Sequence, residues 1–151
     1  MQRFLWFLPT VLLLAADRLT KAWAVDHLPL AVPQRLIGNV IRLTYVQNTG
    51  GVFGILPGNG TAFIAASAAV GLVLVVLLLH PRVRGGWLRF GLSVILAGAI
   101  GNLIDRAAYS YVIDFFEIRG FPVFNLADSC ITVGAVLVVI CVLWGGERDR
   151  S

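Results

Sequence analysis

The feature that most constrains this chain is the run Thr61–Leu79, nineteen residues without a single charged side chain. A helix needs about 20 apolar residues to cross a hydrocarbon layer roughly 30 Å thick, so this run is long enough to span a membrane. The whole chain of 151 residues is 58% hydrophobic and 13% charged, whereas soluble domains carry about 25% charged residues. This composition excludes a soluble enzyme, a disordered tail and a two-domain protein.

Three further apolar runs have a similar length. The predicted spanning helices cover about residues 4–25, 61–79, 88–104 and 126–144. The first run, preceded by Arg3, also fits a cleaved signal peptide. We favour a spanning helix because Asp17, Arg18 and Lys21 interrupt the run and the rest of it is strongly apolar. In the third run, small residues recur at every fourth position, which lets helix backbones approach closely in a bilayer. We expect Gly145-Gly146 to end the fourth helix.

Arginine residues predict the orientation of the four spans. One side holds Arg3, Arg82, Arg84, Arg89, Arg148 and Arg150, and the other holds Arg35, Arg42, Arg106 and Arg119. Short loops follow the positive-inside rule best, and three of these arginines lie in or beside the short connection 80–89. We therefore expect both termini in the cytoplasm. The loops 26–60 and 105–127 then face outward.

Two segments of the outward loops have the pattern of strands. Val40–Val46 alternates apolar and polar residues with a period of two, and Tyr111–Ile118 is rich in β-branched and aromatic residues. The two segments could pair with each other. The predicted fold class is therefore an all-α membrane protein, a single polytopic domain over residues 1–151. It has four transmembrane helices and a small extracytoplasmic β-rich platform.

Three acidic residues on three different spans reach nearly the same depth. At 1.5 Å per residue, Asp17 lies about 20 Å along the first span, Asp105 about 22 Å along the third and Asp128 about 24 Å along the fourth. The polar residues within about one turn of this level are Asn102, Arg106, Lys21 and Asn125. An ionisable group inside a span costs roughly 2.5–3.5 kcal/mol, so it normally faces a protein interior and marks a function.

Some of these residues have a simpler structural interpretation. Asp17 and Lys21 are four positions apart in the favourable acid-before-base order, which predicts a structural ion pair. Asp105 and Arg106 are adjacent, and we expect their opposite charges to balance. Asn102 and Arg106 share one helix face, which would suit a site lined by that face.

Asp114 and Asp128 differ from Asp17, because neither has a basic residue three or four positions away. Two carboxylates brought close together can share one proton, so that one acts as a base on water while the other acts as an acid. An aspartic peptidase uses this chemistry, but a proton-coupled transporter also needs carboxylates in the membrane. From these residues alone, both functions remain open. The basic residues do not form the patch with interleaved aromatics that nucleic acid would need, and no His/Cys cluster has metal-ligand spacing.

Five sequence blocks together resemble the lipoprotein signal peptidases, the type II signal peptidases of bacteria. The blocks are Asp17-Arg-Leu-Thr-Lys21, Asn48-Thr-Gly-Gly-Val-Phe53, Gly101-Asn-Leu-Ile-Asp-Arg106, Val112-Ile-Asp-Phe115 and Phe124-Asn-Leu-Ala-Asp128. They occur in the order and at the spacing of that family, and they extend over nearly the whole chain. Val52 is a departure, since the family more often has a small residue there.

The resemblance implies a membrane-embedded aspartic endopeptidase in the bacterial cytoplasmic membrane, with its site near the outer leaflet. Such an enzyme removes signal peptides from diacylglyceryl-modified prolipoproteins by cleaving before the lipidated cysteine. Its partners would be lipidated prolipoproteins and membrane lipid, and it would need no metal or other cofactor. We expect a monomer. The alternative function is a small four-helix proton-coupled transporter.

The resemblance also assigns roles to individual residues. The catalytic pair of the family falls on Asp114 and Asp128. The substrate-binding or supporting positions fall on Asn48, Asn102, Arg106 and Asn125. The polar residues that we expect to be structural are Asp17, Lys21 and Asp105.

Overall fold

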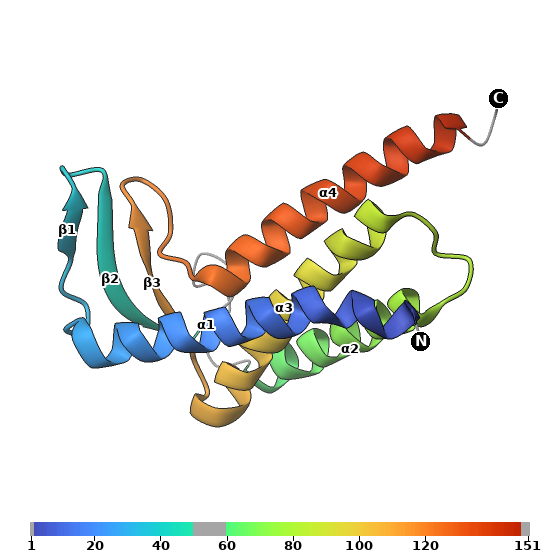
Figure 1. Ribbon diagram of the computed structural model, residues 1–151. Helices are drawn as coiled ribbons and strands as arrows, with labels where there is room; N and C mark the ends of the chain where they lie inside the picture. The colour runs from blue at the N-terminus through green and yellow to red at the C-terminus, as the bar shows by residue number, and fades with distance from the viewer. Residues whose placement is uncertain (1, 50–59, 149–151) are drawn as a thin grey trace.

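The computed structural model describes residues 2–49 and 60–148. Long helices pack beside one another, and a small sheet lies at one end of them (Figure 1). In chain order the elements are the 3₁₀ helix η1 (Gln2–Phe7), α1 (Leu8–His27), β1 (Gln34–Ile37), β2 (Ile41–Asn48), α2 (Gly60–Leu79), α3 (Gly86–Tyr109), β3 (Val112–Ile118) and α4 (Leu126–Arg148). The two termini lie at the end of the helices opposite the sheet (Figure 1).

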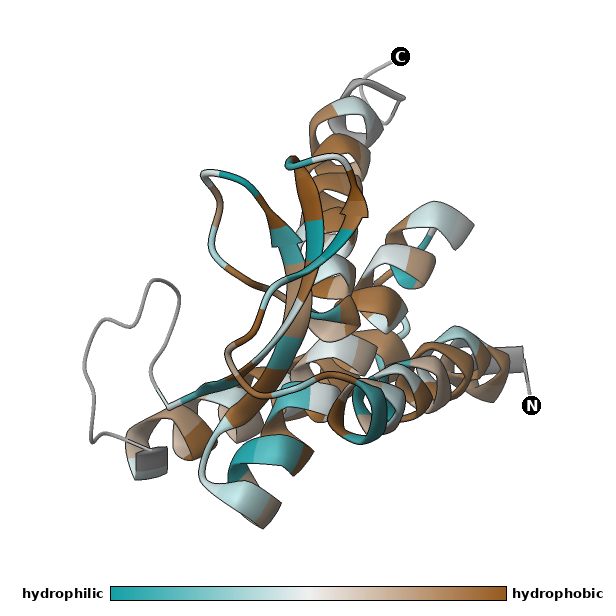
Figure 2. Cartoon of the chain, turned by 90° about the vertical axis from the view of Figure 1, so that its left-hand side faces the viewer, coloured by the Kyte–Doolittle hydropathy of each residue, from teal (hydrophilic) through white to brown (hydrophobic). Residues whose placement is uncertain are grey.

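Three helices in the described part of the chain are long and apolar enough to cross a membrane. They are α2 over Thr61–Leu79, α3 over Gly86–Tyr109 and α4 over Leu126–Trp144. Hydrophobic residues dominate most of α4, whereas hydrophilic residues are frequent on the strands (Figure 2). These three helices confirm three of the predicted spans. Helix α1 is as long as α2 but carries several charges, so its crossing of the membrane stays a prediction.

Two helices extend further than the sequence predicts. Helix α3 continues to Tyr109, so the connection expected to begin at residue 105 begins after Tyr109, and both Asp105 and Arg106 are helical. A charged residue does not end a helix when its charge is paired, and α3 ends only where Ser110 adopts a left-handed conformation with φ of 66°. Helix α4 likewise continues past Gly145-Gly146 to Arg148. Glycine weakens a helix by about 1 kcal/mol per residue but does not by itself end it.

Helices α3 and α4 approach each other closely at glycine residues. A Cβ atom added to Gly98 would lie 2.2 Å from the carbonyl oxygen of Ala127, and one added to Gly134 would lie 2.8 Å from that of Gly91. The backbones can meet this closely only because no side chain stands between them. The spacing of small residues in the third span correctly predicted a close helix contact. This contact places the first turn of α4 against the middle of α3.

Gly98→Ala is expected to lower the free energy of unfolding by about 1–3 kcal/mol, because the new methyl group must push the backbone of Ala127 away. The measurement is thermal unfolding in detergent. Gly71→Ala on α2 is the matched control, since a Cβ atom there meets nothing within 4 Å. The prediction fails if both variants unfold at the wild-type temperature.

The sheet has three antiparallel strands in the order β1-β2-β3. Strands β2 and β3 confirm the two predicted strand segments and their pairing, with Asn48 opposite Val112 and Val46 opposite Asp114. Strand β1 was not predicted, because its four residues are all exposed and show no alternation of buried and exposed positions.

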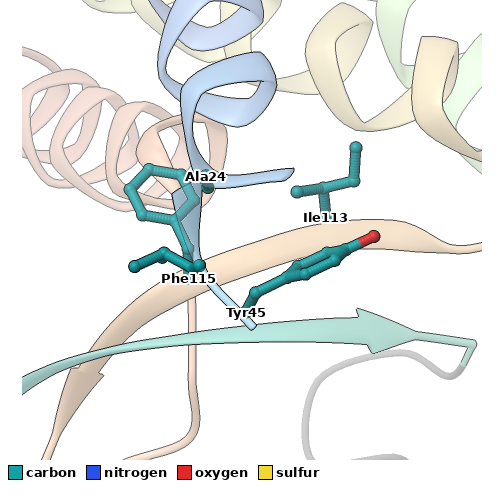
Figure 3. Close-up of a cluster of buried hydrophobic side chains, with 5 residues drawn as sticks. Ala24, Tyr45, Ile113 and Phe115 are labelled. Carbon is teal, nitrogen blue, oxygen red and sulfur yellow. The ribbon is translucent and has the colours of Figure 1, made fainter. Parts of the chain in front are cut away.

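A cluster of apolar side chains joins the end of α1 to the sheet (Figure 3). Ala24 of α1 and Leu28, just after its end, pack against Tyr45 of β2 and against Ile113 and Phe115 of β3, and all five are buried. Burying apolar area contributes about 25 cal/mol per Å². The contact therefore fixes β3, which carries Asp114, relative to the helices.

Candidate active site

Asp114 lies on β3 and is 1% exposed. Asn48 is the last residue of β2 and stands opposite Val112, so Asp114 is its diagonal neighbour across the two strands. Asn48 Nδ2 donates a hydrogen bond of 2.9 Å to Asp114 Oδ2. The sequence block that begins at Asn48 continues through residues 50–53, including Val52, which lie outside the described residues.

Asp128 lies in the first turn of α4, and Asn125 caps the start of that helix. Asn125 Oδ1 accepts a hydrogen bond of 2.8 Å from the backbone N–H of Asp128. In return, Asp128 Oδ2 accepts one of 3.3 Å from the backbone N–H of Asn125. This reciprocal arrangement satisfies two N–H groups that a helix start leaves unpaired. Capping therefore fixes the position of the Asp128 side chain.

Asparagine side chains connect the two carboxylates. Asn125 Nδ2 donates to Asp114 Oδ1 at 2.7 Å, while the same residue caps the helix turn of Asp128. Asn102 on α3 donates from Nδ2 to Asp128 Oδ1 at 2.7 Å, and its Oδ1 accepts from Asn125 Nδ2 at 3.1 Å. Hydrogen bonds thus join Asp114 and Asp128 to three of the four residues that the sequence placed around them, and the fourth, Arg106, lines a pocket together with Asp128.

Beside this group lies a cluster of four charged side chains, of which Asp17, Lys21 and Asp105 are buried and Arg18 is half-buried. Lys21 Nζ lies 3.1 Å from Asp17 Oδ2 and 2.7 Å from Asp105 Oδ2. Arg18 contacts the same two carboxylates, at 2.9 Å from Asp17 Oδ2 and 2.7 Å from Asp105 Oδ1. The predicted pair of Asp17 and Lys21 is confirmed, as part of a larger cluster.

The expected balance between Asp105 and Arg106 is wrong. Asp105 pairs with Arg18 and Lys21 of α1 instead. Consecutive residues of a helix point about 100° apart, since a turn takes 3.6 residues. Asp105 therefore faces α1, while Arg106 faces another side of α3.

Arg18 is the member of the cluster to which sequence reasoning gave no role. The sequence did indicate a role for Arg18, because a guanidinium inside an apolar run is costly unless it has a buried partner. That partner, Asp105, lies 87 positions further along the chain, so no local pattern could identify it.

The charged cluster holds the two elements that carry Asp114 and Asp128. Asp105 Oδ2 accepts a hydrogen bond of 3.2 Å from the backbone N–H of Ile113, next to Asp114. Asp17 Oδ1 accepts one of 3.0 Å from the backbone N–H of Ala127, next to Asp128. Lys21 Nζ in addition donates to Asn102 Oδ1 at 3.1 Å.

A pocket of about 230 Å³ opens at one side of this group. The polar residues of its lining are Asn48, Arg106, Asp128 and Thr132, and the apolar ones are Val112, Phe121, Pro122, Val123, Phe124 and Ile131. Asp128 is half-buried and lines the pocket, whereas Asp114 is buried and is not among the lining residues. The pocket therefore offers room for a small apolar group and a water molecule next to one carboxylate.

The environment of Asp114 favours its protonated form. Burial raises the pKa of Asp114 to about 7, and the nearby charge of Asp128 adds to this rise. Hydrogen bonds from Asn48 and Asn125, and the charge of Lys21, act in the opposite direction. Two carboxylates of which one holds a proton near neutral pH can act together as an acid and a base. Within residues 2–49 and 60–148, no group of three or more His, Cys, Asp or Glu side chains could hold a metal ion.

The chain is similar to known proteins in sequence and in fold. A family model described as signal peptidase (SPase) II matches residues 9–144. A lipoprotein signal peptidase of Streptococcus pyogenes serotype M6 is 40% identical over 150 residues, and one from serotype M2 is 39% identical; each match covers 97% of both chains. Two solved structures described as a bacterial membrane enzyme are also similar. One has a TM-score of 0.88 at 28% identity and covers 95% of this chain and 90% of that one. The other has a TM-score of 0.83 at 29% identity and covers 91% and 92%.

Proposed function

This chain belongs to the signal peptidase II family, and on that premise we propose that it is an aspartic endopeptidase whose catalytic pair is Asp114 and Asp128. Membership of the family makes it a bacterial protein of the cytoplasmic membrane that removes signal peptides from prolipoproteins. The family decides between the two functions that the residues alone left open, in favour of the peptidase. The observation that carries the catalytic proposal is the hydrogen-bonded link through Asn125 between two carboxylates beside a pocket.

Asp128 acts as the base in this proposal, because its carboxylate faces the pocket where a water molecule can enter. It takes a proton from the water, which attacks the peptide carbonyl before the lipidated cysteine. Asp114 supplies the proton that the carbonyl oxygen gains, consistent with its pKa of about 7. When the tetrahedral intermediate collapses, the C–N bond breaks and the pair returns a proton to the leaving amine.

The surrounding polar residues have supporting roles. Asn48, Asn102 and Asn125 hold the two carboxylates in place through the hydrogen bonds described above. Arg106 faces the pocket, and its positive charge stabilises the negative charge that develops on the carbonyl oxygen before Asp114 protonates it. Asp17, Lys21 and Asp105 are structural, because they bind one another and the starts of β3 and α4.

The proposed membrane arrangement adds α1 to the three apolar helices as a fourth span of a single domain. Two charged residues in the middle of α1 point inward in this arrangement, since Asp17 and Lys21 are each at most 1% exposed. Both termini lie in the cytoplasm, the sheet lies outside, and the pocket lies near the outer leaflet. The acyl chains of the precursor stay in the lipid while the peptide is cleaved. The protein acts as a monomer.

The test is to incubate the detergent-purified protein with a precursor that carries a diacylglyceryl-modified cysteine and with the unmodified precursor. We expect cleavage of the modified precursor alone, at the bond before that cysteine, detected by mass spectrometry. Equal cleavage of both precursors would contradict the proposed substrate. Absence of cleavage together with flux driven by a pH gradient in vesicles would favour a transporter instead.

A further inference from the structure

Arg106 is held in the pocket in an unusual way. Its guanidinium carbon lies 5.4 Å from the ring centroid of Phe63, near the start of α2. Among the described residues it forms no ion pair, in contrast to Arg18 and Lys21, which each contact two carboxylates. The ring of Phe63 therefore contacts the Arg106 guanidinium, which also interacts electrostatically with Asp128 and Asp114.

An aromatic partner leaves the chemistry of the guanidinium available. A carboxylate would neutralise the charge and occupy two of the five N–H donors. A ring attracts the cation through its π face, while the N–H groups remain free to bind other acceptors. Because Arg106 lines the same pocket as Asp128, its free donors can reach a molecule bound there.

We propose that Phe63 is a positioning residue, which holds the Arg106 guanidinium in the pocket so that its N–H groups bind carbonyl oxygens of the lipidated precursor. This inference rests on the function proposed above. It gives α2, which otherwise supplies no side chain to the site among the described residues, a part in substrate binding. The oxygens belong either to the peptide or to the ester groups of the diacylglyceryl chain.

The first experiment compares the side chain at position 63. The dissociation constant of the lipidated precursor is measured in the Asp128→Asn background, so that no turnover disturbs binding. Phe63→Leu keeps an apolar side chain but removes the π face, and it is expected to weaken binding about two- to thirtyfold. Phe63→Trp, with the strongest π face, is expected to bind as tightly as the parent. Phe90→Leu, near the other end of α3, is the matched control and should leave the dissociation constant unchanged.

The second experiment tests whether Phe63 acts through Arg106. In an Arg106→Leu background, Phe63→Leu is expected to change the dissociation constant less than twofold. A dialkyl ether precursor, which lacks the ester carbonyls, distinguishes the two kinds of oxygen. If Phe63→Leu still weakens its binding, Arg106 contacts the peptide; if the effect disappears, Arg106 contacts the esters.

The proposal is overturned if Phe63→Leu and Phe63→Trp both bind as the parent does, or if Trp weakens binding as much as Leu. It is also overturned if Phe63→Leu weakens binding equally with and without Arg106. Failure of the proposed function would show in a separate observation, because the Asp128→Asn protein would then still cleave the precursor. In that case the same comparisons are made on KM.

Discussion

Asp128→Asn and Asp114→Asn are each expected to lower the turnover number for a lipidated precursor by about 10²- to 10⁴-fold. An amide has almost the shape of a carboxylate, but it can neither take a proton from water nor deliver one to a carbonyl oxygen. Each variant should therefore fold and still bind precursor. The measurement is cleavage of the modified precursor by purified protein, with unfolding in detergent as the check on folding.

The pH dependence of stability provides a control on the Asp114 variant. Burial raises the pKa of Asp114 to about 7, above its unfolded value of about 4. The folded state then binds more protons than the unfolded state between these values, so wild-type stability falls as the pH rises from about 4 to about 7. Asp114→Asn removes this contribution of Asp114. Between about pH 4 and pH 8, its free energy of unfolding should therefore fall less than that of the wild type.

Asp26→Asn supplies the matched control for activity, because Asp26 is an exposed aspartate at the end of α1. It should cleave the precursor at the wild-type rate. If either Asp114→Asn or Asp128→Asn also cleaved at that rate while remaining folded, the assignment of the catalytic pair would be wrong.

Local patterns predicted the elements of this fold well. Long apolar runs predicted α2 and α4, alternation predicted β2, and β-branched and aromatic residues predicted β3, because these signals depend on neighbours within one element. Helix ends were less predictable. The end of α3 depends on Asp105 having buried partners on α1, and no residue near Asp105 in the chain reveals them.

Contacts between particular side chains on different helices were the part that the residues alone could not predict. The i,i+4 pair of Asp17 and Lys21 was found because one helix contains both residues. The link from Arg18 to Asp105 and the contact of Phe63 with Arg106 were missed, because each joins two helices. Asp114 and Asp128 were singled out through their lack of a local partner, but only the resemblance to a family made them a pair. Asn125 forms hydrogen bonds with Asn102, Asp114 and Asp128, and only the structure shows that one side chain connects them.

Lys21 is the only lysine of the chain, and its side chain is 1% exposed. Its ammonium group contacts Asp17, Asp105 and Asn102. Without it, Arg18 alone would face two buried carboxylates. Removing one partner of a buried ion pair typically costs about 3–5 kcal/mol, because the remaining charge has lost its compensation.

Lys21→Met is therefore expected to lower the free energy of unfolding by about 3–5 kcal/mol. Arg119→Met removes the same positive charge from an exposed position and should change stability by less than about 0.5 kcal/mol. Both are measured by unfolding in detergent. The hydrogen bonds to Asp128 from Asn102 and Asn125 do not involve Lys21 directly, so the folded fraction of Lys21→Met should lose far less activity than the Asp128→Asn protein. A Lys21→Met protein as stable as the wild type but inactive would instead place Lys21 in the catalytic machinery.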